Sequence, residues 1–253
     1  MSIPAPQIVL ILGSAPSALA ARDWVDHPFD AIVAINNAWA IRDDWTHTIH
    51  PDDFPADRHA PVVAGGQARI LSDDYVPFQN LYGGVLYAGG TMAFTTGYWA
   101  LGALRPKVMA FLGCDMVYPA AGKTHFYGTG APDPLRVDIS LRNLEAKSAR
   151  LMLIAAREGC QTVNISTDPE SRLVMPRARL SDLTALPDGP AVPDADAMHR
   201  ALAQEDLLDY RVPHGRYWEE ADRFDPARID AVDDLWLAAL ERSRATSEVE
   251  RSA

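Results

Sequence analysis

The stretch Gln7-Ile8-Val9-Leu10-Ile11-Leu12-Gly13-Ser14-Ala15-Pro16-Ser17 changes character at its middle. Its first half is an unbroken apolar run rich in β-branched residues, which is typical of a strand buried on both faces. The small residues from Gly13 onward end that strand, and the Ala-Leu-Ala-Ala sequence that follows permits a helix. A helix that begins after such a turn presents unpartnered backbone N–H groups and favours negative charge. The stretch therefore predicts a site for a phosphate group, most simply that of a nucleotide.

The residues of this turn that we expect beside the phosphate are Gly13, Ser14, Ala15 and Ser17. The turn has neither the Gly-x-Gly-x-x-Gly pattern of dinucleotide-binding proteins nor the Lys of a Walker loop. An ordinary strand-to-helix turn of an α/β protein remains the alternative.

Strands and helices are predicted to alternate along the next part of the chain. Further buried strands are expected at 30–35, 45–49, 67–71, 85–88, 107–112 and 161–165, with loops over 72–84 and 116–134. A buried helix capped by Thr91 should run to Gly102, and the helix with the clearest apolar face should have Asp138 as its N-cap and stop at Gly159. This alternation predicts an α/β fold with a doubly wound, mostly parallel, Rossmann-like sheet.

Ligands of such sheets bind beyond the carboxyl ends of the strands. Ser14, Asn36, His50 and Asp115 each follow a predicted strand. We therefore expect these four residues to meet at one edge of the sheet.

The composition divides the chain into three parts. Residues 1–168 are predicted to form a nucleotide-binding Rossmann-like domain, and residues 169–243 a Pro-rich linker followed by a C-terminal helical appendage. The helices of the appendage are expected at 196–208 and 226–240. Residues 244–253 are charged and small, and we expect a disordered tail.

The overall charge limits the partners. The chain has 23 Lys and Arg against 34 Asp and Glu, a net charge of -11, which argues against nucleic acid as a partner. No apolar run is long enough for a transmembrane segment, and the first residues lack a secretion signal, so a cytoplasmic location is the simplest expectation. Two cysteines, Cys114 and Cys160, stand outside any metal-ligand spacing, and no metal site is predicted.

The order of these motifs resembles the bacterial sialyltransferases of glycosyltransferase family 42. The features that carry the resemblance are the turn at Gly13, the strand ending at Asn36, the Gly90-Thr91 helix start, the strand into Asp115 and a loop rich in His and Tyr. It covers about residues 7–168, and the same core is similar to hydroxymethylpterin pyrophosphokinase-like proteins. The resemblance implies a metal-independent transfer from a nucleotide sugar of the CMP type to a glycan acceptor, with no resident cofactor.

The resemblance also implies roles for individual residues. The donor nucleotide would be held by Ser14, Asn36, His50, Gly90, Thr91 and Asp115. His125 would be the general base, because an imidazole accepts protons near neutral pH, and Tyr118 and Tyr127 would donate O–H groups to the departing phosphate. In the family the loop reads His-aromatic-x-Gly-His, and here Thr129 occupies the position of the second His, while Val117 stands at the first Tyr position.

Three hypotheses follow from these residues. The first is a glycosyltransferase-like enzyme of surface glycan synthesis. The second is a diphosphate transferase that uses ATP and Mg²⁺, and the third is a non-catalytic nucleotide-binding module, which the Thr at position 129 motivates. The sequence leaves open the sugar, the acceptor and whether the chain forms a homo-oligomer.

Overall fold

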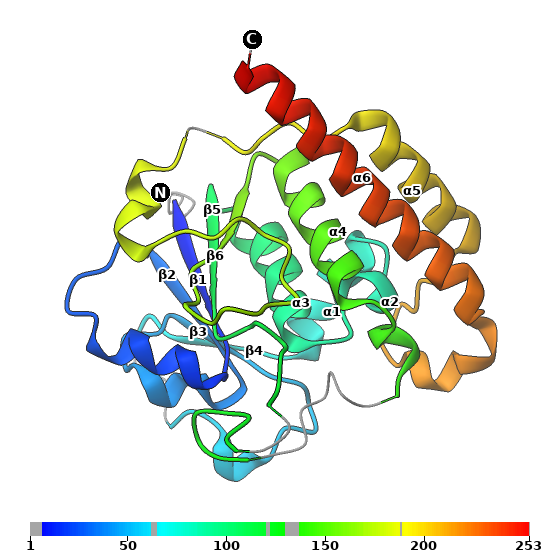
Figure 1. Ribbon diagram of the computed structural model, residues 1–253. Coiled ribbons are helices and arrows are strands. Elements are labelled where there is room, and N and C mark those ends of the chain that lie inside the picture. Colours follow the sequence, from blue (N-terminus) through cyan, green and yellow to red (C-terminus); the bar gives the residue numbers. More distant parts are fainter. Residues whose placement is uncertain (1–6, 62–64, 120–121, 130–136, 188, 253) are drawn as a thin grey trace.

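A computed structural model describes residues 7–61, 65–119, 122–129, 137–187 and 189–252. Its centre is a six-stranded sheet in the order β4-β3-β2-β1-β5-β6, in which every paired neighbour is parallel (Figure 1). The strands are β1 (Ile8–Leu12), β2 (Ala31–Ile35), β3 (His47–Ile49), β4 (Ala68–Ile70), β5 (Val108–Leu112) and β6 (Gln161–Asn164). The chain therefore has the predicted α/β, Rossmann-like architecture.

The central strand β1 contributes side chains to two hydrophobic clusters, one on each face of the sheet. Val9 and Ile11 belong to the cluster under the α-helices, whereas Leu10 and Leu12 belong to the opposite one. All four side chains are fully buried. This is the alternation that a pleated strand imposes, and it explains why the apolar run of β1 has no polar positions.

Different kinds of helix cover the two faces. One face carries the 3-10 helices η1 (Pro16–Asp23) and η2 (Asn36–Ile41). The other carries α1 (Ser72–Leu81), α2 (Val85–Ala88), α3 (Met92–Trp99) with the π-turn η4 (Ala100–Leu104), and α4 (Leu144–Arg157). Short 3-10 turns stand at η3 (Ala56–Arg58), η6 (Ile139–Leu141), η7 (Leu180–Ala185) and η8 (Tyr217–Arg223).

The C-terminal helices form a further layer. Helices α5 (Ala195–Leu208) and α6 (Pro226–Ser252) lie side by side, and α6 packs on α4 rather than on the sheet (Figure 1). Among the described residues, none of the helices combines the length and apolar character needed to cross a bilayer.

Buried charges join this layer to the rest of the molecule. Arg150 of α4 is bound at 2.7 Å by Glu205 of α5, and both side chains are less than 5% exposed. Trp236 of α6 donates its indole N–H to the same Glu205 at 2.6 Å. The predicted boundary at residue 168 thus separates segments that share one apolar cluster and one buried ionic network.

Two predictions between β4 and α3 are wrong. Residues 85–88, predicted as a strand, form helix α2, because a run of four buried apolar residues between glycine pairs suits either structure. The loop predicted over 72–84 is mostly helix α1, whose first turn is capped by the Asp74 carboxylate accepting from Leu71 N at 3.0 Å. Pro77 obscured this helix in the sequence.

Two helix boundaries also differ from the predictions. Asp138 caps the short turn η6, and the cap of α4 is Asn143, whose side chain accepts from Ala146 N at 3.0 Å. Helix α6 continues to Ser252, so the predicted disordered tail is wrong over residues 244–252. These residues contain good helix formers and neither Gly nor Pro, and Arg244 ties them to Val174 O at 2.8 Å.

Candidate functional site

The carboxyl ends of the strands form an edge of the sheet that carries polar residues. At β1 the order in which the chain adds strands changes from one side of the sheet to the other. Strand β1 has β2 on one side and β5 on the other, and this is the switch point at which doubly wound sheets bind their ligands. His50, Asn36, Ser14 and Asp115 follow β3, β2, β1 and β5, so the structure brings them to one carboxyl edge as predicted. Neighbouring strands are about 4.8 Å apart, so these residues form a row along the edge.

The turn after β1 is closed against the turn after β5. Gly13 N donates to Leu112 O at 2.8 Å, and Ala15 N donates to Gly113 O at 3.1 Å. A Cβ at Gly13 would lie only 2.3 Å from Gly113 O. The small size of Gly13 therefore serves the contact between two strand ends, and its N–H and that of Ala15 are already bonded.

Ser14 and Ser17 supply the hydroxyl groups of this turn, and both residues are half-buried. Helix η1 begins with Pro16, which has no N–H, so this helix start offers fewer donors than the sequence suggested. The Ser17 Oγ atom is buried and has no partner among the described residues.

A loop carrying the predicted catalytic residues is fastened to this turn. Phe126 N donates to Ser14 O at 2.9 Å, and Phe126 packs on the apolar cluster below. His125 and Gly128 exchange two backbone hydrogen bonds, of 3.0 and 3.1 Å, which close a tight turn. Thr129 Oγ1 donates to Gly122 O at 2.8 Å, so it joins the two ends of the loop.

Aromatic rings surround the His125 side chain. The ring of Tyr127 stacks on it with centroids 4.9 Å apart, and the ring of Tyr118 lies at 6.1 Å. Thr124 Oγ1 lies 2.9 Å from His125 Nδ1 and orients the imidazole. The three predicted catalytic residues are thus together beside Ser14, and Tyr127 is 46% exposed, so the group faces solvent.

Several buried polar atoms along the edge lack a hydrogen-bond partner. Among the described residues these include Oδ1 of Asn36, Oδ1 of Asn37, Nε2 of His50 and Oδ2 of Asp115. Buried polar atoms are normally paired, because leaving one unpaired costs about 1–3 kcal/mol. They lie at the carboxyl ends of β3, β2 and β5, on both sides of β1, and this grouping indicates a place where a polar ligand binds.

Asn36 also has an unusual backbone. Its φ is +54°, in the left-handed region that Asn tolerates better than most side chains. Such a conformation at a strand end is frequent at binding sites, where surrounding structure holds it in place.

His50 presents an acceptor to the same edge. Burial lowers its pKa, so the ring is neutral at physiological pH. Nδ1 lies 2.9 Å from Pro51 O and donates to it, which leaves Nε2 as the acceptor. The ring packs against that of His59 with centroids 4.3 Å apart.

Asp115 is held by a residue that the sequence reasoning missed. Asn164, the last residue of β6, donates from Nδ2 to Asp115 Oδ1 at 2.8 Å, and its own Oδ1 accepts from Ser166 N at 2.9 Å. Arg177 places a guanidinium nitrogen 3.9 Å from the same carboxylate. The position of Asn164 at a strand end was the available signal, whereas Arg177 approaches only through the fold.

The predicted residues Gly90 and Thr91 have structural roles. Gly90 has φ +86°, and a Cβ there would lie 2.4 Å from Ser140 O, so the turn η6 packs directly on it. The Thr91 hydroxyl accepts from Phe94 N and caps α3. In the described part of the chain, neither of them has a buried side-chain atom that lacks a hydrogen-bond partner.

No group of three or more His, Cys, Asp or Glu within the described ranges is arranged to hold a metal ion. Both cysteines are buried thiols without a disulfide, and burial raises the pKa of Cys160 to about 12. They are therefore unreactive apolar side chains at neutral pH.

The fold and this edge define an α/β protein with a parallel sheet, whose switch point is polar and partly covered by a His/Tyr loop. Comparison with protein-family models, curated proteins and solved structures gives no match. The resemblance to sialyltransferases stays a prediction that rests on the motifs.

Proposed function

We propose that this chain is a glycosyltransferase-like enzyme that uses a nucleotide-activated sugar, with a CMP sugar as the first choice. The observation that supports it best is the hydrogen bond from Phe126 N to Ser14 O, because it holds the candidate base beside the turn expected to hold phosphate. The unpaired atoms of Asn36 and His50 would accept N–H or O–H groups of the nucleoside.

In the proposed reaction, His125 takes the proton of an acceptor hydroxyl. The hydroxyl oxygen forms a bond to the anomeric carbon as the bond from that carbon to the phosphate oxygen breaks. The electron pair of that bond leaves with the nucleoside monophosphate. Hydroxyl donors such as Tyr118, Tyr127 and Ser17 would stabilise the departing phosphate without a metal ion.

The first test is calorimetry of the folded protein with CMP, CDP, UDP and GDP. We expect saturable binding of CMP that EDTA leaves unchanged. Absence of binding by all four nucleotides would overturn the proposal. Binding of ATP that EDTA abolishes would instead favour a Mg²⁺-dependent diphosphate transferase.

The second test separates catalysis from binding. His125→Ala should lower transfer from a CMP sugar at least about 100-fold, because general bases contribute that much or more, and should leave CMP affinity unchanged. His199→Ala is the matched control, since His199 is exposed on α5. Equal activity of the two variants would exclude His125 as the base.

A nucleotide-binding module without turnover is a second candidate. Thr129, at the position of the family's second His, is bonded to Gly122 O and offers no basic group. CMP binding without transfer to any acceptor would favour this candidate.

A further inference from the structure

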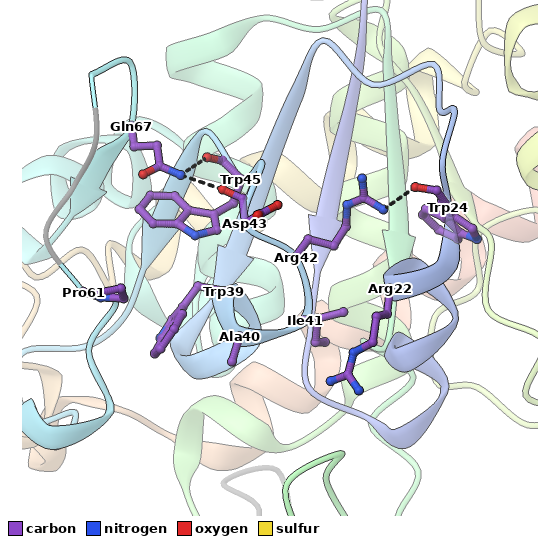
Figure 2. Close-up of a pocket in the computed structure, with 10 residues that line it drawn as sticks. All are labelled: Arg22, Trp24, Trp39, Ala40, Ile41, Arg42, Asp43, Trp45, Pro61 and Gln67. Carbon is purple, nitrogen blue, oxygen red and sulfur yellow. Dashed lines mark hydrogen bonds between the residues drawn. The ribbon is translucent and has the colours of Figure 1, made fainter.

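A cavity of about 710 Å³ is lined by residues at the far ends of η1 and η2 and by the segment that leads into β3 (Figure 2). Helix η1 carries the chain away from Ser14, and Arg22 and Trp24 lie at and just beyond its far end. Eight residues of 3-10 helix span about 16 Å, so the cavity and the turn at Ser14 are separate places. Trp45, on the opposite wall, precedes β3 and so lies near the amino ends of the strands.

Three of the six tryptophans of the chain line this cavity. Figure 2 shows Trp39 and Trp45 toward one end and Trp24 at the other, with Ile41 and Arg42 between them. Trp24 and Trp39 are half-buried and pack on the apolar cluster beneath the 3-10 helices. The indole N–H of Trp39 donates to Arg58 O at 3.0 Å, which fixes its ring.

Polar groups stand between and beside the aromatic rings. The Arg42 guanidinium pairs with Asp44 and donates to Trp24 O at 2.9 Å, so it is neutralised and holds one wall in place. The side chains of Arg22 and Asp43 are exposed, and no hydrogen bond or ion pair engages them within the described part of the chain. The two unpaired groups are one cation and one anion, so the cavity favours a ligand without net charge.

We propose that this cavity is a binding site for a neutral oligosaccharide. Sugar rings have one apolar C–H face and a rim of hydroxyls, and they match Trp faces beside Arg and Asp, which donate to and accept from hydroxyls. The alternative ligand for a tryptophan-lined site is a quaternary ammonium ion. Such an ion is compact, so the aromatic rings that bind it must surround a single point. Here the two half-buried rings, those of Trp39 and Trp24, lie toward opposite ends of the lining, whereas Trp45 is only 4% exposed and supports the wall (Figure 2). This separation suits a chain of at least two sugar units. The inference does not depend on the proposed transferase activity.

The test is a titration of intrinsic tryptophan fluorescence in the intact chain. The probes are maltotriose, cellotriose and triacetylchitotriose, and tetramethylammonium chloride is the cationic comparison. We expect a saturable change with at least one trisaccharide and none with tetramethylammonium. Trp39→Ala should weaken that binding about tenfold or more. Trp218→Ala, which removes a tryptophan that is 63% exposed in η8, should leave it unchanged.

Asp43→Ala and Arg22→Ala provide variants that do not disturb the fold, because both side chains are exposed. Each should weaken trisaccharide binding severalfold while the melting temperature stays at the wild-type value. The proposal is overturned if no trisaccharide binds, if binding is unaffected in both of these variants, or if tetramethylammonium alone saturates. His125→Ala should bind the trisaccharide as the wild type does. Trisaccharide binding therefore tests the cavity, and sugar transfer tests the proposed transferase, independently of each other.

Discussion

At the scale of single residues, the turn after β1 shows how one small residue can suit two different purposes. The sequence predicts Gly13 as a place where a phosphate approaches the backbone. In the structure the approach is made by the backbone of Gly113. A phosphate and the Gly113 backbone can each approach residue 13 only if it has no side chain. The sequence therefore predicts where the turn is, but not which group packs against Gly13.

The Gly13 contact gives a stability prediction. Gly13→Ala would place Cβ 2.3 Å from Gly113 O, and because the neighbour is backbone it cannot rotate away. We expect the free energy of unfolding to fall by about 1–3 kcal/mol in urea titrations. Gly65→Ala is the control, since nothing lies within 4 Å of a Cβ there, and its effect should be below about 0.5 kcal/mol. Equal stability of the two variants would contradict the contact.

At the scale of elements, strands were easier to predict than helices. The apolar runs of β1, β2 and β5 are five residues long, rich in apolar side chains and buried, which is typical of a strand covered on both faces. Helices α1 and α2 were missed because their stability comes from tertiary contacts. The Gln79 side chain of α1, for example, donates to Thr95 of α3 at 3.0 Å inside the protein.

The contact between α4 and α6 contains an acid that should make stability depend on pH. Burial raises the pKa of Asp233 to about 6, from an ordinary value of 3.8, and its Oδ2 has no partner among the described residues. The folded state therefore binds the Asp233 proton more tightly than the unfolded state does. As a result, the free energy of unfolding falls as the pH rises from 3.8 to about 6.

Asp233→Asn removes this titration. Between about pH 4 and pH 7 we expect the wild type to lose about 2–3 kcal/mol more unfolding free energy than the variant. Urea titrations of both proteins at the two pH values measure the difference. If the unfolding free energies of the two proteins change equally with pH, Asp233 has the same pKa in the folded and unfolded states, and this prediction is wrong.

At the scale of the whole molecule, the site was predictable where it depends on chain connectivity. Parallel strands bring Ser14, Asn36, His50 and Asp115 to one edge whatever else surrounds them. The approach of Arg177 to Asp115 and the tryptophan-lined cavity were not predictable, because their residues meet only when helices and loops pack. The catalytic, nucleotide and partner assignments themselves remain predictions.

The C-terminal helices should be required for the stability of the whole chain. Glu205→Gln would leave Arg150 buried without its counter-ion, and we expect a loss of about 3–5 kcal/mol in unfolding free energy. The Glu145–Arg172 pair is the control, since both of its side chains are at least 40% exposed. Glu145→Gln should change stability by less than about 1 kcal/mol. Similar losses in the two variants would contradict a structural role for the buried pair.

The link between Phe126 and Ser14 uses main-chain atoms alone. Side chains elsewhere in that loop can therefore be exchanged during evolution without detaching it from the sheet. Replacement of a single side chain, such as that of the exposed Tyr127, would change the chemistry of this surface while the backbone hydrogen bond from Phe126 to Ser14 persists. Substitutions in this loop can therefore change which side chains react without changing the backbone hydrogen bond that attaches the loop to the turn after β1.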